Sequence, residues 1–169
     1  VADGSATITA ISGSVNATAT ATVSQVTASV TLSPTSLSFA SFSDTTTLVP
    51  TVKDANNNTI PSPTVTWATS SSSIATVSSA GLVTAIADGS ATITATSGSV
   101  NQTAAVTVSQ AATSVTLAPT SLSFASVDDT TTLVPTVKDA NDNTIPSPTV
   151  TWATSSSSVA TVSSAGLVT

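Results

Sequence analysis

The chain has 169 residues and a net charge of −6, because eight Asp side chains face only two cations, Lys53 and Lys138. A nucleic-acid-binding surface needs clustered Lys and Arg that displace counterions, and an anionic membrane surface attracts the same basic clusters. The composition therefore excludes both kinds of partner. Cys is absent, which excludes a disulfide framework and thiolate chemistry.

Direct insertion of this segment into a membrane is not expected. A membrane-spanning helix needs roughly 18 or more consecutive apolar residues, and Ser and Thr interrupt every apolar run of this chain.

The sequence repeats itself with a fixed offset of 85 residues, which relates Trp67 to Trp152 and Gly81 to Gly166. A long fixed period indicates a modular array. We interpret residues 26–109 as one complete unit. Residues 1–25 then correspond to the last strands of a preceding unit, and residues 110–169 to the first part of a following unit.

Within the complete unit, short β-branched runs alternate with turn residues, which is typical of an all-β sandwich or barrel. The pattern predicts seven or eight strands. They lie in an opening segment at 30–39 that is broken at Pro34, and at 47–53, 65–68, 74–77, 82–86, 91–95 and 104–108.

Turn residues separate these runs. Ser78–Gly81 and Asp88–Gly89 predict hairpins. Ser97–Asn101 predicts a further turn, and Ile60–Pro63 predicts a stiff, extended connection because a proline restricts the residue before it.

The aromatic side chains are predicted to lie inside. Trp67 and Phe39, with their equivalents Trp152 and Phe124, alternate with Thr or Ser on strands, which favours a core position over an exposed sugar-stacking platform. Phe42 becomes Val in the next copy, so we expect it at a boundary between units.

Five segments carry a resemblance to a known family. They are Val30–Pro34, Asp44–Leu48, Val65–Trp67, Ile74–Ala85 and Asp88–Ala95. Together they resemble the bacterial immunoglobulin-like domain family, group 2. The resemblance implies tandem Ig-like β-sandwich modules of about 85 residues, used as stalk modules in long surface proteins that include intimin- and invasin-like adhesins.

The chain departs from this family at two turns. Ser43 and Asp128 hold one place where the family usually has Gly, and Asn57 and Asp142 hold a second. Asn and Asp tolerate a left-handed backbone better than most residues do. Ser43 is therefore the position where we expect backbone strain.

The two partial units together contain one whole unit in register, since Thr169 matches Thr84 and Val1 matches Ile86. Two explanations are open. The chain is a section of a continuous polypeptide, as is normal for such arrays, or separate chains complete each other's sandwiches by strand donation.

Few residues offer chemistry. The chain lacks His, Cys, Tyr, Glu and Arg, so an abundant Ser has no suitable base, and we expect no enzyme and no catalytic residue. Calcium is the one cofactor candidate, because oxygen side chains alternate in two equivalent loops; an ordinary Asx-rich turn is the favoured alternative. The candidate ligands are Asp54, Asn56, Asn58, Asp139, Asn141 and Asn143.

Two further kinds of site follow from the sequence. Asp3, Asp88, Asp44 and Asp129 are candidates to meet at junctions between units and share an ion. Separately, the Asn-x-Thr pattern marks glycan acceptors; the candidates are Asn16, Asn57 and Asn101.

These observations predict a structural stalk or fibre module of an exported, repetitive cell-surface protein. The expected partners are neighbouring copies of the unit, end to end and laterally, since low charge removes the repulsion between like surfaces. The alternatives are an adhesive module for carbohydrate or host protein, which needs an exposed apolar patch, and a subunit of a strand-exchange polymer.

Overall fold

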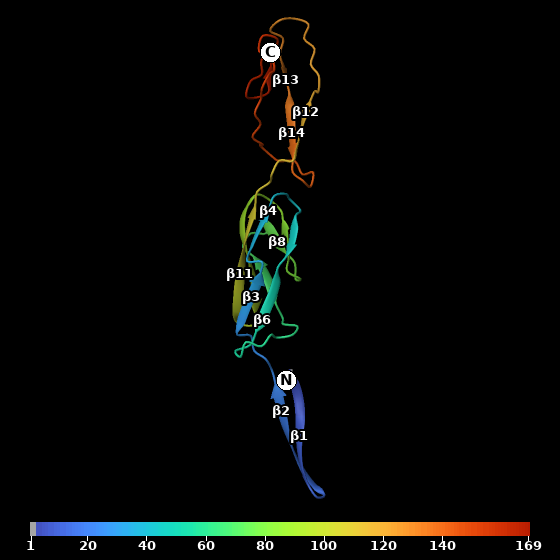
Figure 1. Ribbon diagram of the computed structural model, residues 1–169, viewed down its shortest axis with the longest axis vertical. Coiled ribbons are helices and arrows are strands. Elements are labelled where there is room, and N and C mark those ends of the chain that lie inside the picture. The colour runs from blue at the N-terminus through green and yellow to red at the C-terminus, as the bar shows by residue number, and fades with distance from the viewer. Residues whose placement is uncertain (1–2) are drawn as a thin grey trace.

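The computed structural model describes residues 3–169, which form three parts in a row along one long axis (Figure 1). An isolated hairpin lies at one end, a complete sandwich in the middle and an open, incomplete sandwich at the other end. We call them the N-terminal hairpin (residues 4–23), the complete unit (26–109) and the incomplete unit (110–169). No helix occurs between residues 3 and 169, so none of the described chain is a membrane-spanning helix.

The complete unit is an all-β sandwich. Its nine strands are β3 (Ser29–Ser33), β4 (Ser36–Phe39), β5 (Thr45–Thr47), β6 (Val49–Lys53), β7 (Thr66–Thr69), β8 (Ala75–Val77), β9 (Leu82–Ala85), β10 (Gly89–Ser97) and β11 (Val100–Val108). One sheet has the order β4-β11-β10-β7, and the other side is built from β3-β6 and β5-β9-β8. Only the β4–β11 pair is parallel among the strand pairs of this unit.

The core follows from strict alternation of apolar and polar residues. On β10, the side chains of Ala91, Ile93 and Ala95 are buried and the Thr residues between them are not. Leu48 and Val83 oppose them from the other side of the core and are fully buried. Because side chains alternate across a strand, this spacing places one apolar row inside and one Thr row outside.

Three sequence predictions need correction. The unit has nine strands and not seven or eight, because the chain is divided at Leu48 as well as at Pro34: β5 pairs with β9, whereas β6 pairs with β3. Asp88–Gly89 is not a hairpin turn: it carries the chain from β9 in one sheet to β10 in the other. The hairpins at Ser78–Gly81 and around Gly98 are confirmed, with φ of +80° and +59° at the two glycines.

The connection Ile60–Pro63 is also not extended throughout. Ser62 has φ +54°, and its equivalent Ser147 has φ +57°. The prediction considered only the steric effect of the following proline, whereas the chain must bend here to enter β7 from the Lys53–Thr59 bridge.

The incomplete unit repeats the fold only where the partner strands are present. It contains β12 (Ser114–Ala118), β13 (Thr131–Thr132), β14 (Val134–Lys138) and β15 (Leu167–Val168). Residues 121–124 and 151–154, the equivalents of β4 and β7, are not strands. In the complete unit β4 pairs only with β11 and β7 only with β10, so these two elements are absent where the equivalents of β10 and β11 are absent.

The N-terminal hairpin consists of β1 (Gly4–Ser12) and β2 (Val15–Val23) and has the same register as β10–β11. Gly4 pairs with Val23 as Gly89 pairs with Val108. Every residue of β1 and β2 is exposed.

Candidate functional site: the junction between units

One side of the junction is the loop Asp139–Asn143 of the incomplete unit. The Asp139 Oδ1 atom accepts hydrogen bonds from the backbone N–H groups of Asn141 and Asn143, both at 3.0 Å. Asp142 closes the loop with φ +67°. The alternation of Asp and Asn therefore builds an Asx turn, in which a side chain replaces a backbone acceptor.

The same loop occurs in the complete unit with the same internal contacts. Asp54 Oδ1 accepts from the N–H groups of Asn56 at 3.0 Å and Asn58 at 2.9 Å, and Asn57 has φ +64°. The loop conformation is thus fixed by its own sequence and does not depend on a neighbouring unit.

The other side of the junction is the turn Ser41–Asp44 of the complete unit. Asp44 Oδ2 accepts from Ser41 N–H at 3.1 Å, and Ser43 donates its N–H to the Ala85 carbonyl at 3.0 Å. Ser43 has φ +68°, which confirms the expected left-handed position. A non-glycine residue in this region carries backbone strain, and the contacts around it hold the turn in place.

Five hydrogen bonds join the turn to the loop. Phe42 N–H donates to Asp139 Oδ2 at 3.0 Å, and the Phe42 carbonyl accepts from the side-chain amides of Asn141 at 2.8 Å and Asn143 at 3.1 Å. The amide of Asn141 also donates to Asp44 Oδ1 at 2.8 Å, and Ala140 N–H donates to the Ser41 hydroxyl at 3.2 Å. Phe42 is therefore a boundary residue, as predicted, and its backbone makes three of these five bonds.

The connecting segment between the units is tied to both of them. Gln110 donates its backbone N–H to Asp88 Oδ1 at 2.7 Å and its side-chain amide to Asp139 Oδ2 at 2.9 Å. Ala111 N–H donates to the Ala40 carbonyl at 2.8 Å. The sequence analysis did not identify Gln110, although its recurrence as Gln25 at the same place in the repeat was a usable signal.

Asp139 is the buried acidic residue of the junction, and it is only 3% exposed. Burial raises the pKa of its carboxyl group, but hydrogen bonds from the Gln110 side chain, the Phe42 N–H and Asn143 outweigh burial and lower the pKa to about 2. The pKa of Asp54 is also lowered, chiefly by the Gln25 side-chain amide and then by the Asn58 N–H.

The loop geometry bears on the calcium hypothesis. A calcium site needs carboxylate and carbonyl oxygens directed at the ion, whereas both Asp139 oxygens accept N–H donors and the Asn141 and Asn143 amides turn their NH₂ groups toward the junction. In the Asp54 loop, both carboxylate oxygens likewise accept N–H donors. Between residues 3 and 169 no three acidic groups gather as metal ligands. These residues do not fit calcium in this arrangement. Whether calcium binds in solution is a question for measurement of the melting temperature with and without the ion.

Asp44 and Asp88 both lie at the junction, yet each carboxylate accepts an N–H or amide donor. The glycan candidates Asn16, Asn57 and Asn101 are all exposed.

Phe39 is buried and Trp67 is half-buried against the core, next to Gly81. Both aromatic side chains therefore pack with the core, as predicted.

The fold and the junction define a class: a modular Ig-like sandwich whose complete unit is hydrogen-bonded to the next unit of the same chain. Residues 26–108 match the model of the bacterial Ig-like domain family, group 2, and the complete unit belongs to this family. No match was found among curated proteins.

Solved structures with a similar chain path include surface-layer proteins and adhesins. Domains 4 and 5 of the S-layer protein SbsC are 27% identical over 63% of this chain and 58% of theirs, with a TM-score of 0.45. Domains 1–6 of SbsC are 25% identical over 85% of this chain and 20% of theirs, with a TM-score of 0.48. The Escherichia coli adhesin FdeC is 20% identical over 83% of this chain and 52% of its own, with a TM-score of 0.46. The chain thus spans less than two thirds of each of these structures.

Proposed function

We propose that these units are spacers of an extended, load-bearing array on the outside of a cell, and that the junction fixes the orientation of each unit relative to the next. The observation that carries this proposal is the set of five hydrogen bonds between Ser41–Asp44 and Asp139–Asn143. A flexible linker between independent domains would leave these groups to water.

Three features of the chain support a spacer role. The family is one of bacterial Ig-like domains. The near-identity of the copies suits a protein that needs the same unit repeatedly. The inventory of side chains lacks the nucleophile–base pairs of an enzyme. Contact between neighbouring copies end to end is part of the proposal, and lateral contact stays a prediction.

The test is the distribution of distances between the two units. Spin labels on Cys introduced at Thr107 and Thr136, two exposed positions, report it by pulsed electron paramagnetic resonance. The chain has no native Cys, so labelling is specific. We expect one narrow distribution in the parent chain, because the junction allows a single orientation.

The double variant Asn141→Ala with Asn143→Ala removes three of the five junction bonds and should broaden this distribution. The matched control, Asn56→Ala with Asn58→Ala, alters the equivalent loop, which contacts no equivalent turn in this molecule, and should leave the distribution narrow. If the distance distribution of the parent chain is already broad, or if both double variants broaden it equally, the junction does not orient the units.

A further inference from the structure

The linker between the two units, residues 109–113, lies between β11 and β12 and is held by backbone hydrogen bonds. Ser109 N–H donates to the Phe39 carbonyl at 3.0 Å, and Ala111 N–H donates to the Ala40 carbonyl at 2.8 Å. The two donors are two residues apart, so they lie on the same side of an extended chain. These bonds therefore continue the parallel ladder between β4 and β11 beyond the last residue of β11.

The residue between these two donors bonds in the opposite direction. Gln110 N–H donates to Asp88 Oδ1 at 2.7 Å, and Asp88 directly precedes β10. In the sheet, β11 lies between β4 and β10. The N–H groups of the linker thus alternate between both neighbours of β11, as they do for a strand in the middle of a sheet.

The following unit holds the other end of the linker. Thr113 N–H donates to the Lys138 carbonyl at 2.8 Å, and the β12–β14 ladder begins at the next residue, Ser114. The complete unit has the same bond at its own start, where Ala28 N–H donates to the Lys53 carbonyl at 2.8 Å. This attachment is therefore a property of the repeat.

The linker consequently has almost no slack. Among its five N–H groups, only that of Ala112 has no hydrogen-bond partner within residues 3–169. A flexible linker lets two domains change orientation because many consecutive residues are free. A single unbound N–H between two bonded neighbours does not provide such a hinge.

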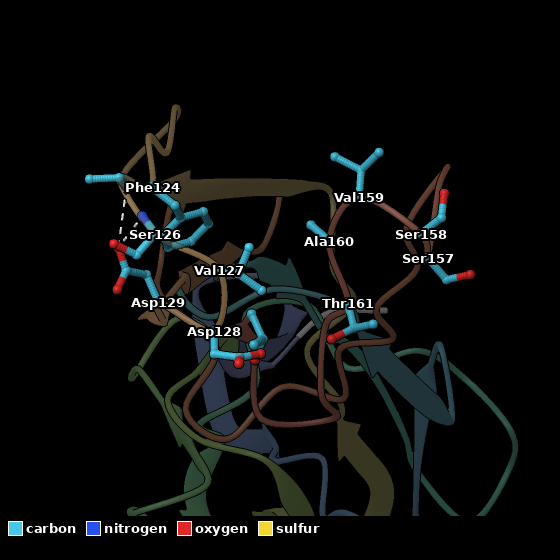
Figure 2. A pocket seen from close by; sticks show the side chains of 12 residues that line it. Phe124, Ser126, Val127, Asp128, Asp129, Ser157, Ser158, Val159, Ala160 and Thr161 are labelled. Atoms are coloured by element: carbon cyan, nitrogen blue, oxygen red, sulfur yellow. Dashed lines mark hydrogen bonds between the residues drawn. The ribbon is translucent and has the colours of Figure 1, made fainter.

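The acceptor at Ala40 is positioned by the turn that follows it, Ser41–Asp44. The incomplete unit has the same turn at Ser126–Asp129. There the Asp129 carboxylate faces the turn, and its Oδ2 atom accepts from Ser126 N–H at 3.0 Å (Figure 2). The turn thus forms from its own sequence in both units, and this fixes the place of the neighbouring carbonyl.

Tension along the array acts on both ladders along their strands. The chain enters the complete unit at the end near the hairpin and leaves it at the end near the incomplete unit (Figure 1). Because β4 and β11 are parallel, a pull on the two ends draws these strands in opposite directions. Their bonds are then strained together and do not open one after another. The antiparallel β12–β14 ladder has bonds perpendicular to its strands, so a pull from the linker loads it in the same way.

We propose that residues 109–113 are a tension-carrying strand, held by the preceding unit through the β4–β11 ladder and by the following unit through the β12–β14 ladder. The two units neither hinge nor separate under tension until one of these ladders fails. This inference rests on the proposed function, in which the units are spacers under load. The side chains of Asn141 and Asn143 set the orientation of the units, whereas the main chain of the linker transmits force, so the two roles can fail separately.

Hydrogen exchange of single amides, followed by NMR on the 169-residue chain, tests the bonding pattern. The amides of Ser109, Ala111 and Thr113 should exchange at least about 100-fold more slowly than in an unfolded chain, and the Ala112 amide within about tenfold of the unfolded rate. Exchange of all four within about tenfold of the unfolded rate would overturn the proposal. Protection of Ala112 equal to that of Ala111 would also overturn it.

Single-molecule force spectroscopy tests whether the strand carries tension. Cys residues introduced at the exposed positions Val26 and Thr116 attach the handles, so that force crosses the complete unit and the linker. Ala111→Pro removes the N–H that bonds to Ala40 and should raise the unfolding rate at constant force about 3–10-fold. The matched control Ala112→Pro removes an N–H that bonds to no group of residues 3–169, and its rate should stay within about twofold of the parent.

A second pulling geometry separates force transmission from a general loss of stability. With the handle moved from Thr116 to the exposed Thr107, the force bypasses the linker, and the two proline variants should unfold within about twofold of each other. Equal rates for both variants in the first geometry would contradict the proposal, as would the same difference between them in both geometries. A broad spin-label distribution in the parent chain would refute the fixed orientation and leave these force and exchange results to be decided on their own.

Discussion

Gly81 is the position where a single added methyl group should damage the unit most clearly. Its φ is +80°, and a Cβ atom at this place would lie 2.6 Å from the Leu48 carbonyl oxygen and 2.8 Å from Trp67 Cζ2. Leu48 cannot retreat easily, because its N–H also donates to the Gly81 carbonyl at 2.9 Å. Gly81→Ala thus combines a left-handed backbone, which costs a residue with Cβ about 1–2 kcal/mol, with overpacking, which costs about 1–3 kcal/mol.

The expected loss is about 2–5 kcal/mol of the free energy of unfolding, out of the roughly 5–15 kcal/mol typical of a domain. Urea denaturation followed by Trp67 fluorescence in a Trp152→Phe background measures it. With a slope near 1 kcal/mol per molar urea, the midpoint should fall by about 2 M or more.

Gly98→Ala is the matched control within the same unit. Gly98 has φ +59°, but its added Cβ would meet only Thr27 at 3.8 Å, an ordinary contact. This variant should lose only the conformational part, about 1–2 kcal/mol. If Gly81→Ala is no less stable than Gly98→Ala, the approach of Leu48 and Trp67 is not what requires glycine at position 81.

Two further predictions concern the junction. The pKa of Asp139 in the folded chain, about 2, lies below its ordinary value of 3.8. The hydrogen bonds of its carboxylate therefore contribute fully above about pH 4 and are lost as the pH falls through 2. The distribution of spin-label distances should stay narrow at pH 5 and broaden near pH 2, and broadening already between pH 7 and 5 would contradict this pKa. Because Asp54 and Asp139 accept N–H donors, neither EDTA nor millimolar calcium should change the melting temperature. A rise of several degrees with calcium would show that an ion reorganises the loops.

The sequence predicted the architecture because the relevant signals are local. Alternation on β10 placed Ile93 in the core. The family resemblance, which usually has Gly where Ser43 and Asn57 stand here, indicated the left-handed turns at these two positions. The 85-residue repeat predicted the modular array, and the family model matches its one complete unit over residues 26–108.

The errors arose where the answer depends on distant residues. Asp88–Gly89 has the composition of a hairpin turn, but β9 finds its partners in β5 and β8, so the chain crosses to the other sheet. Likewise, no local signal could show that Asp139 accepts from the N–H of Phe42, 97 positions away. Alternating Asp and Asn predicted an oxygen-rich loop, but only the tertiary structure shows that its donors and acceptors face another unit.

The two sides of the junction also explain how the copies differ. Phe42 takes part through its backbone N–H and carbonyl, so its replacement by Val127 in the next copy leaves the bonding groups unchanged. The loop takes part mainly through side chains, and Asp139, Asn141 and Asn143 recur unchanged as Asp54, Asn56 and Asn58. Because Phe42 contributes only its backbone, the junction tolerates a change of side chain at this position of the turn, whereas Ser41 and Asp44 contribute side-chain groups. The loop residues are therefore those whose substitution should disorder every junction of an array built from these units.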